Sequence, residues 1–185
     1  MEEKKMKINC IIAIDPGVSN GGICIYRPKD IPKCIRMPKD IYGLRDILQH
    51  YKGISKPIVF VEKLSIRPDD VRASEGEFNP KIFRIQKMLA NLTEIKAVLE
   101  LLDIPFVLVH PSKWQSVLKL RIKGEEKSER KKRYKEVARK LYPIVNTTLW
   151  NADAILMMHF GRYMLQNNLS WVLQNLPERI RNSLF

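Results

Sequence analysis

Short apolar runs alternate along the chain with longer stretches in which apolar residues recur at helical spacing. The run at 8–14 is rich in β-branched residues and stops at the turn-forming residues 15–17, which predicts a buried strand. Two further short runs, at 22–26 and 34–37, follow turn signals. The chain is therefore expected to open as an antiparallel three-stranded meander.

The middle of the chain predicts two helices separated by a strand. Apolar residues stand at helical spacing over 44–51, and the apolar run 58–61 then leads into Glu62. The polar segment 64–78 is expected to connect this strand to the next helix with little regular structure. Asn79 and Pro80 are typical of a helix start, and the apolar pattern continues to residue 102.

The remainder predicts a buried strand at 105–109, a short helix opened by Pro111, a basic helix and a last helix over about 150–166. No repeat or low-complexity linker divides the chain. We therefore expect one domain over 1–185, with its core in about 8–165 and a C-terminal appendage at 166–185. The fold class is α/β, with a five-stranded mixed sheet of three antiparallel strands and then parallel strands, flanked by helices.

Charge adds a class of partner to this picture. The 185 residues are 45% hydrophobic and 29% charged, as in globular proteins, but the net charge is +13. Such an excess favours a polyanion, with nucleic acid ahead of an anionic membrane surface. No apolar run is long enough to span a membrane, and the first residues are charged rather than apolar. We expect a cytoplasmic protein without a membrane partner.

The positive charge is concentrated in one segment. Residues 119–140 contain eleven Lys or Arg and four Glu, a net charge of +7 that exceeds half of the total. Val137, Ala138 and Leu141 are expected to form the buried stripe of this basic helix. The segment can be a DNA-binding surface or an ordinary solvated helix face, and its charge imbalance favours contact with DNA.

Three acidic residues stand at distinctive places in the pattern. Asp15 ends the first strand, Glu62 ends the fourth, and Asp153 lies in the first turn of the last long helix. Each alone has an ordinary explanation as a turn residue, a solvated strand end or a favourable charge at a helix start. Together, in a basic chain, they predict a site for Mg²⁺ or Mn²⁺ of the kind that cleaves phosphodiesters.

The motifs IIAIDPGVSNGGICIY, VFVEK and NADAILMMHF occur in this order, and together they resemble the RuvC type of Holliday junction resolvase, which has the ribonuclease H fold. The resemblance covers about residues 8–165. It implies a homodimer, paired through the helix 80–102, that nicks four-way DNA junctions symmetrically in DNA recombination and repair. It also implies two Mg²⁺ ions per active site, with Mn²⁺ able to substitute, in the cytoplasm of a bacterial or phage-infected cell.

The resemblance implies that Asp15, Glu62 and Asp153 are the catalytic, metal-binding acids. The fourth ligand of the family falls on Trp150, which cannot bind a metal ion, so the second ion is expected to be held weakly. Asn151 can be an oxygen ligand or a helix cap. The expected DNA-binding residues follow the fourth and fifth predicted strands or lie in the basic segment: Arg67, Phe78, Lys113, Lys123, Lys127, Arg130, Lys131 and Arg133.

Two other functions fit parts of the sequence. The missing fourth ligand suits a protein on the same fold that binds branched nucleic acid without cutting it, or that acts on another substrate. An actin-like ATPase also begins with a strand, an acidic glycine turn and a hairpin, but it needs a second related domain for which this chain has neither the length nor a repeated motif.

Overall fold

The computed structural model describes residues 8–17, 21–64 and 80–184. Its centre is a five-stranded sheet in the order β3-β2-β1-β4-β5. The antiparallel pairs β1–β2 and β2–β3 are followed by the parallel pairs β1–β4 and β4–β5, which confirms the predicted mixed sheet. The strands are β1 (Cys10–Asp15), β2 (Gly22–Tyr26), β3 (Lys33–Arg36), β4 (Pro57–Glu62) and β5 (Phe106–Val109).

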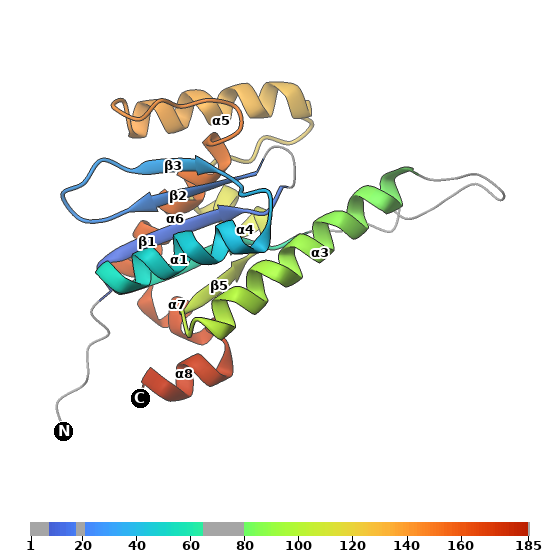
Figure 1. Ribbon diagram of the computed structural model, residues 1–185. Coiled ribbons are helices and arrows are strands. Elements are labelled where there is room, and N and C mark those ends of the chain that lie inside the picture. Colours follow the sequence, from blue (N-terminus) through green and yellow to red (C-terminus); the bar gives the residue numbers. More distant parts are fainter. Residues whose placement is uncertain (1–7, 18–20, 65–79, 185) are drawn as a thin grey trace.

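Helices cover both faces of the sheet, which explains why the central strands are continuous apolar runs rather than alternating ones. Ile12 and Ile14 of β1 point to a core formed with α1 (Ile41–Ile54) and α3 (Pro80–Leu101). Ile11 and Ala13 point to the opposite core, which contains α4 (Pro111–Val117), α5 (Lys127–Leu141) and α6 (Ala152–Asn167). Figure 1 shows α1 and α3 in front of the sheet and α6 behind it.

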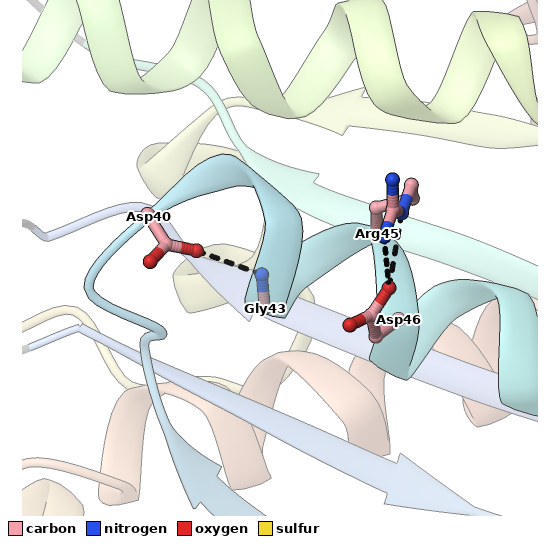
Figure 2. A network of polar contacts seen from close by, with 4 residues as sticks. All are labelled: Asp40, Gly43, Arg45 and Asp46. Atoms are coloured by element: carbon pink, nitrogen blue, oxygen red, sulfur yellow. Dashed lines mark hydrogen bonds and ion pairs between the residues drawn. The ribbon is translucent and has the colours of Figure 1, made fainter.

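The start of α1 is fixed by a side-chain cap. Asp40 accepts a hydrogen bond from the backbone N–H of Gly43 at 2.8 Å (Figure 2). This bond satisfies one of the free N–H groups in the first turn of the helix. The nearby pair Arg45–Asp46, also drawn in Figure 2, is exposed and contributes little to stability.

Only one end of α3 contributes to the core. Among its described side chains, the buried ones are Leu92, Ile95, Val98 and Leu99, all in the C-terminal half. The N-terminal half extends beyond the sheet (Figure 1) and exposes Phe83 and Leu89. The side-chain amide of Asn91, near the middle of the helix, donates to the carbonyl of Pro16 at 2.6 Å. The helix therefore helps to hold the turn that follows β1.

The helix α6 lies across the centre of the sheet and is buried over most of its length. It packs against β1, β2 and β4. Gly161 makes this close approach possible, because a Cβ there would lie 2.6 Å from the Phe60 ring. This tight packing fixes where the first turn of α6 lies relative to the ends of β1 and β4.

The C-terminal segment belongs to the core, contrary to the expected appendage at 166–185. It forms α7 (Leu169–Gln174) and α8 (Glu178–Leu184). Val172, Leu176 and Ile180 are buried in the cluster on the α6 side of the sheet. Within the described residues, no helix is long and apolar enough to cross a membrane.

Candidate active site

The first two carboxylates come together because of strand topology. β1 and β4 are parallel neighbours, with Ile14 opposite Val61, so both strands finish at the same edge of the sheet. Asp15 and Glu62, the last residues of the two strands, are therefore adjacent. The backbone N–H of Gly17 donates to Asp15 Oδ1 at 3.1 Å and orients this carboxylate.

Glu62 is held by a tryptophan from a neighbouring segment. Trp114 Nε1 donates to Glu62 Oε1 at 3.1 Å, and the indole is only 1% exposed. β5 pairs in parallel with β4, with Val109 opposite Glu62, and α4 starts two residues after Val109. The topology thus brings Trp114 beside Glu62. Trp114 was not among the predicted site residues, although its position just after the strand beside Glu62 indicated that it could reach the site.

Asp153 approaches the same edge from the first turn of α6. It is 9% exposed, and its Oδ1 has no hydrogen-bond partner among the described residues, whereas its Oδ2 pairs with the Lys131 ammonium of α5. A buried acceptor without a partner carries a cost of about 1–3 kcal/mol, more for a charged group. Lys131 was expected on the DNA-binding surface, but here its ammonium lies at the carboxylates.

The electrostatics show that the three carboxylates act on one another. Burial raises the pKa of Glu62 to about 8, and the charges of Asp15 and Asp153 add to the shift. Burial and the charge of Asp153 raise the pKa of Asp15 to about 6. Burial disfavours the charged form of Lys131, but the charges of Asp153, Asp15 and Glu62 outweigh this effect and raise its pKa. The site is an acidic cluster in need of a cation.

The donor set fits a divalent cation of the Mg²⁺ type, which prefers carboxylate oxygens. Asp153 Oδ1 is available, and one oxygen each of Asp15 and Glu62 makes no hydrogen bond to the described residues. In the part of the chain that the structure describes, no three His, Cys, Asp or Glu side chains are close enough to coordinate one ion together. In this arrangement the Lys131 ammonium compensates part of the negative charge.

Trp150, at the expected position of a fourth ligand, packs on Gly22, the residue of β2 that lies opposite Asp15. Its ring lies against Gly22, where an added Cβ would be 2.9 Å from two ring atoms. The Arg36 guanidinium lies over the ring, 5.0 Å from its centroid. This aromatic packing occupies the place of a ligand and explains why β2 begins with a glycine.

Asn151 stands at the N-cap position of α6, but its side chain makes no cap hydrogen bond to the helix. Its Oδ1 accepts from the backbone N–H of Thr148 at 2.7 Å and from the Thr148 hydroxyl at 3.2 Å. Its amide nitrogen donates to the carbonyl of Asn146 at 2.9 Å. It begins α6 without a side-chain cap bond and instead ties together the turn before the helix. A role as metal ligand would require breaking these bonds.

The expected DNA-binding residues divide into several groups. Lys123 and Lys127 are exposed, and Arg130 is half-buried beside a cavity. Arg133 is instead structural, because its guanidinium binds Glu125 at 2.6 Å and the carbonyl of Leu120 at 2.7 Å. The Lys113 ammonium lies over the Trp171 ring at 5.2 Å. Arg67 and Phe78 lie outside the described residues.

The orientation of α5 explains why Lys131 lies at the carboxylates. Its buried residues are Tyr134 and Ala138, whereas Leu141 of the expected stripe is 41% exposed. The inward face is therefore turned toward positions 131, 134 and 138, which lie on one side of a helix. If the inward face of α5 had been predicted correctly, Lys131 would have been expected on the side of the helix that faces the sheet.

Comparisons with known proteins support the fold. No family model matches the chain, and no curated protein matches it by sequence. The RuvC structure of T. thermophilus in complex with a Holliday junction substrate superposes with a TM-score of 0.56 at 11% identity, covering 86% of this chain and 96% of that chain. A second Thermus thermophilus RuvC structure superposes with a TM-score of 0.54 at 13% identity, covering 90% of this chain and 98% of that chain. The chain therefore has the ribonuclease H-like fold of RuvC, as the motifs indicated.

Proposed function

We propose that this protein is a divalent-cation-dependent endodeoxyribonuclease that resolves four-way DNA junctions by symmetric paired nicks. The observation that carries the proposal is the meeting of Asp15, Glu62 and Asp153 at one edge of the sheet, where their charges shift the pKa values of Asp15 and Glu62. The similarity in fold to a RuvC bound to a Holliday junction substrate supports this choice of DNA. The basic helix α5 beside the carboxylates supports DNA as the substrate.

In this proposal Asp15, Glu62 and Asp153 hold Mg²⁺, which Mn²⁺ can replace, after the cation has drawn them closer together than they lie in the described structure. Bound there, the ion supplies Lewis-acid activation for in-line attack on a phosphodiester. The Gly17 N–H holds one oxygen of Asp15, and the Trp114 indole holds one oxygen of Glu62. The second oxygen of each carboxylate is left available for the ion. Lys131 keeps Asp153 paired until a cation arrives. Because a cation favours ionised carboxylates, its binding lowers the raised pKa values of Asp15 and Glu62.

We propose two ions of unequal affinity in each site. The Trp150 ring is packed on Gly22, and the Asn151 amide is engaged in its own turn. Neither supplies a ligand, so the second ion would rely on shared carboxylate oxygens and bind more weakly. A preference for Mn²⁺ over Mg²⁺ in catalysis would follow from this arrangement.

The proposed enzyme is a homodimer paired through α3. The half of α3 that extends beyond the sheet exposes Phe83 by 55% and Leu89 by 41%. Exposed apolar side chains on a projecting helix suit burial against a second copy. Sedimentation velocity of the protein and of its Phe83→Asp variant tests this arrangement, with a dimer expected for the first and a monomer for the second.

The decisive experiment is cleavage of a labelled four-way junction, beside a linear duplex and an RNA–DNA hybrid, in Mg²⁺ and in Mn²⁺. We expect paired symmetric nicks in the junction alone, and their loss in Asp15→Asn. Asp46→Asn is the matched control, because this carboxylate is exposed on α1 and pairs with its neighbour Arg45. Cleavage of the hybrid alone would instead assign the protein to another activity of the fold.

A protein that binds junctions without cutting them is the second candidate. It is favoured by the packed Trp150 and by the Lys131 ammonium on Asp153, which together reduce the capacity for cations. Tight junction binding with no nicks in either metal ion would establish this function. In that case Asp15→Asn would leave junction binding unchanged or stronger, because it removes a negative charge.

A further inference from the structure

Two of the three cysteines lie side by side near the edge of the sheet. Cys24 of β2 and Cys34 of β3 are direct partners in the antiparallel register, and their sulfur atoms are 2.8 Å apart. Both are free thiols. Directly opposed residues of antiparallel strands have Cα atoms about 4.5–5.5 Å apart, which lies within the range of about 4.4–6.8 Å that a disulfide requires. The two strands are therefore already placed for a disulfide, and a small side-chain rotation is enough to form it.

The third cysteine is kept away from this pair by the sheet itself. Cys10 of β1 belongs to the core formed with α1 and α3, whereas Cys24 and Cys34 face the core on the α6 side. Side chains on opposite faces of a sheet point away from each other. The chain therefore offers one pair of thiols and one isolated thiol, which chemical methods can distinguish.

The two paired thiols differ in their access to a reagent. Cys24 is fully buried, whereas Cys34 is half-buried on the edge strand. The hydrogen bond with Cys34 raises the pKa of the Cys24 thiol well above its ordinary value, and burial adds to the shift. Because the thiolate is the reactive form, a reagent in solution reacts first at Cys34. Cys24 then stands ready behind it as the second thiol.

We propose that Cys24 and Cys34 are a redox modification site, which a small disulfide compound oxidises to an intramolecular disulfide between β2 and β3. The Cys34 thiolate attacks the compound and displaces one of its two sulfurs as a thiolate, which leaves a mixed disulfide. Cys24 then loses its proton and attacks the Cys34 sulfur, which displaces the second small thiolate. The compound thus takes up two electrons and the two cysteine protons and becomes two thiols. An excess of small thiol reverses both exchanges.

The disulfide would hold the strand that the sheet holds least. β3 is an edge strand, and in the described sheet it pairs only with β2. Gly22 and Arg36, on which Trp150 packs, are the next pair on the same face of these two strands. The disulfide therefore fixes the part of the sheet that supports Trp150, and it restricts the unfolded chain. We expect it to stabilise the protein.

The first test incubates the full-length reduced protein with oxidised glutathione, and then measures its mass and its free thiols after denaturation. We expect the mass to fall by two hydrogens, one free thiol to remain, and a digest to contain a peptide pair joined through Cys24 and Cys34. Cys10→Ala is the matched control and should form the same disulfide with no thiol left. Cys34→Ser, a change at the half-buried position, should leave its two buried thiols unreacted. A glutathione retained on Cys34, three free thiols, or a disulfide that includes Cys10 would overturn the proposal.

The second test compares thermal melts of the oxidised and the reduced protein. The oxidised form is expected to melt roughly 5 °C higher, because the disulfide restricts the unfolded chain. Dithiothreitol should remove this difference, and Cys34→Ser treated with oxidised glutathione should not show it. An equal or lower melting temperature in protein that contains the disulfide would show that the bond strains the two strands, and would overturn the proposal that they are placed for it.

Discussion

The carboxylate site and the basic helix beside it are built in different ways. Asp15 and Glu62 end core strands, and Asp153 begins the helix that is most deeply packed on the sheet. Lys127 lies exposed at the start of α5, and Lys123 lies exposed in the segment before it. The positions of the acids are fixed by the core, whereas those of the exposed lysines are fixed by little beyond the helix itself.

This difference has a consequence for mutation. A group held by buried neighbours acts at one place, so its loss cannot be taken over by another residue. Exposed lysines bind phosphates by charge, and adjacent ones substitute for one another. Lys131 belongs to the first class although it lies in the basic helix, because it pairs with Asp153. Substitutions that separate the two classes therefore test the comparison.

Outside the three acidic residues, the largest effect is expected from Trp114→Phe. The change removes the hydrogen bond to Glu62 while keeping an aromatic ring beside Tyr134. Residues that orient metal ligands typically contribute about 10–100-fold to activity or metal affinity, and we expect a loss of cleavage in that range. Trp171→Phe is the control, because this indole packs on Phe160 and the hydrogen bond to Glu62 comes from Trp114. Equal losses in both variants would show that Trp114 acts through packing alone.

A smaller effect, of opposite sign, is expected for metal binding in Lys131→Met. The substitution keeps most of the alkyl chain and removes the ammonium that competes with a cation for Asp153. We expect the affinity for Mn²⁺ to rise about tenfold, because the free energy of such a change is only a fraction of the Coulomb energy of a charge pair. Electron paramagnetic resonance of the free ion measures this affinity. Lys132→Met should leave it unchanged. Weaker Mn²⁺ binding in Lys131→Met would show that the lysine helps to assemble the site.

The sequence was sufficient to predict that the acids meet at one site, but it was insufficient to predict that Lys131 lies beside them. Asp15 and Glu62 each end an apolar run, and parallel strands place such ends at one edge, so local pattern and topology lead to the same site. Lys131 is one of four consecutive basic residues, and only the rotation of α5 distinguishes it from Lys132. That rotation is set by Tyr134 packing on Trp114, a contact across twenty residues that no local pattern contains.

Two other differences have the same origin. Arg133 is neutralised by Glu125, which precedes the helix, so a count of charges overstated the free positive charge. Asn151 looked available because its amide lies two residues before Asp153, but its hydrogen bonds go back to Asn146 and Thr148. In both cases the loop conformation determines the partner. Loop conformation depends on contacts that residue spacing does not encode.

A third prediction concerns pH. In the metal-free protein the folded-state pKa values of Asp15 and Glu62 are about 6 and about 8, above their ordinary values in an unfolded chain. The folded state therefore binds more protons, and the free energy of unfolding falls as pH rises from roughly 4 to 8. Lysines and arginines do not titrate in this range, so the basic helix adds no such slope.

Thermal melts in EDTA between about pH 5 and about pH 9 measure this slope. The double variant Asp15→Asn, Glu62→Gln should flatten it, and Mg²⁺ should restore stability most at the alkaline end, where the carboxylates are ionised. Asp46→Asn is again the control, since its carboxylate is exposed. A melting temperature that rises with pH in EDTA would contradict the raised pKa values.

The smallest effects are expected from the exposed lysines. Lys123→Gln and Lys127→Gln should each weaken junction binding by only a few-fold, because neighbouring charges remain. Each lost phosphate contact should lower the salt slope by about 0.7–0.9, and junction and duplex should be affected alike, since such contacts carry no sequence information. Lys29→Gln, in the turn after β2 at the opposite edge of the sheet, should change neither quantity. A loss of cleavage in either lysine variant as large as that in Trp114→Phe would show that this lysine touches the cleaved strand directly. That lysine would then belong, with Lys131, to the residues that act at one place.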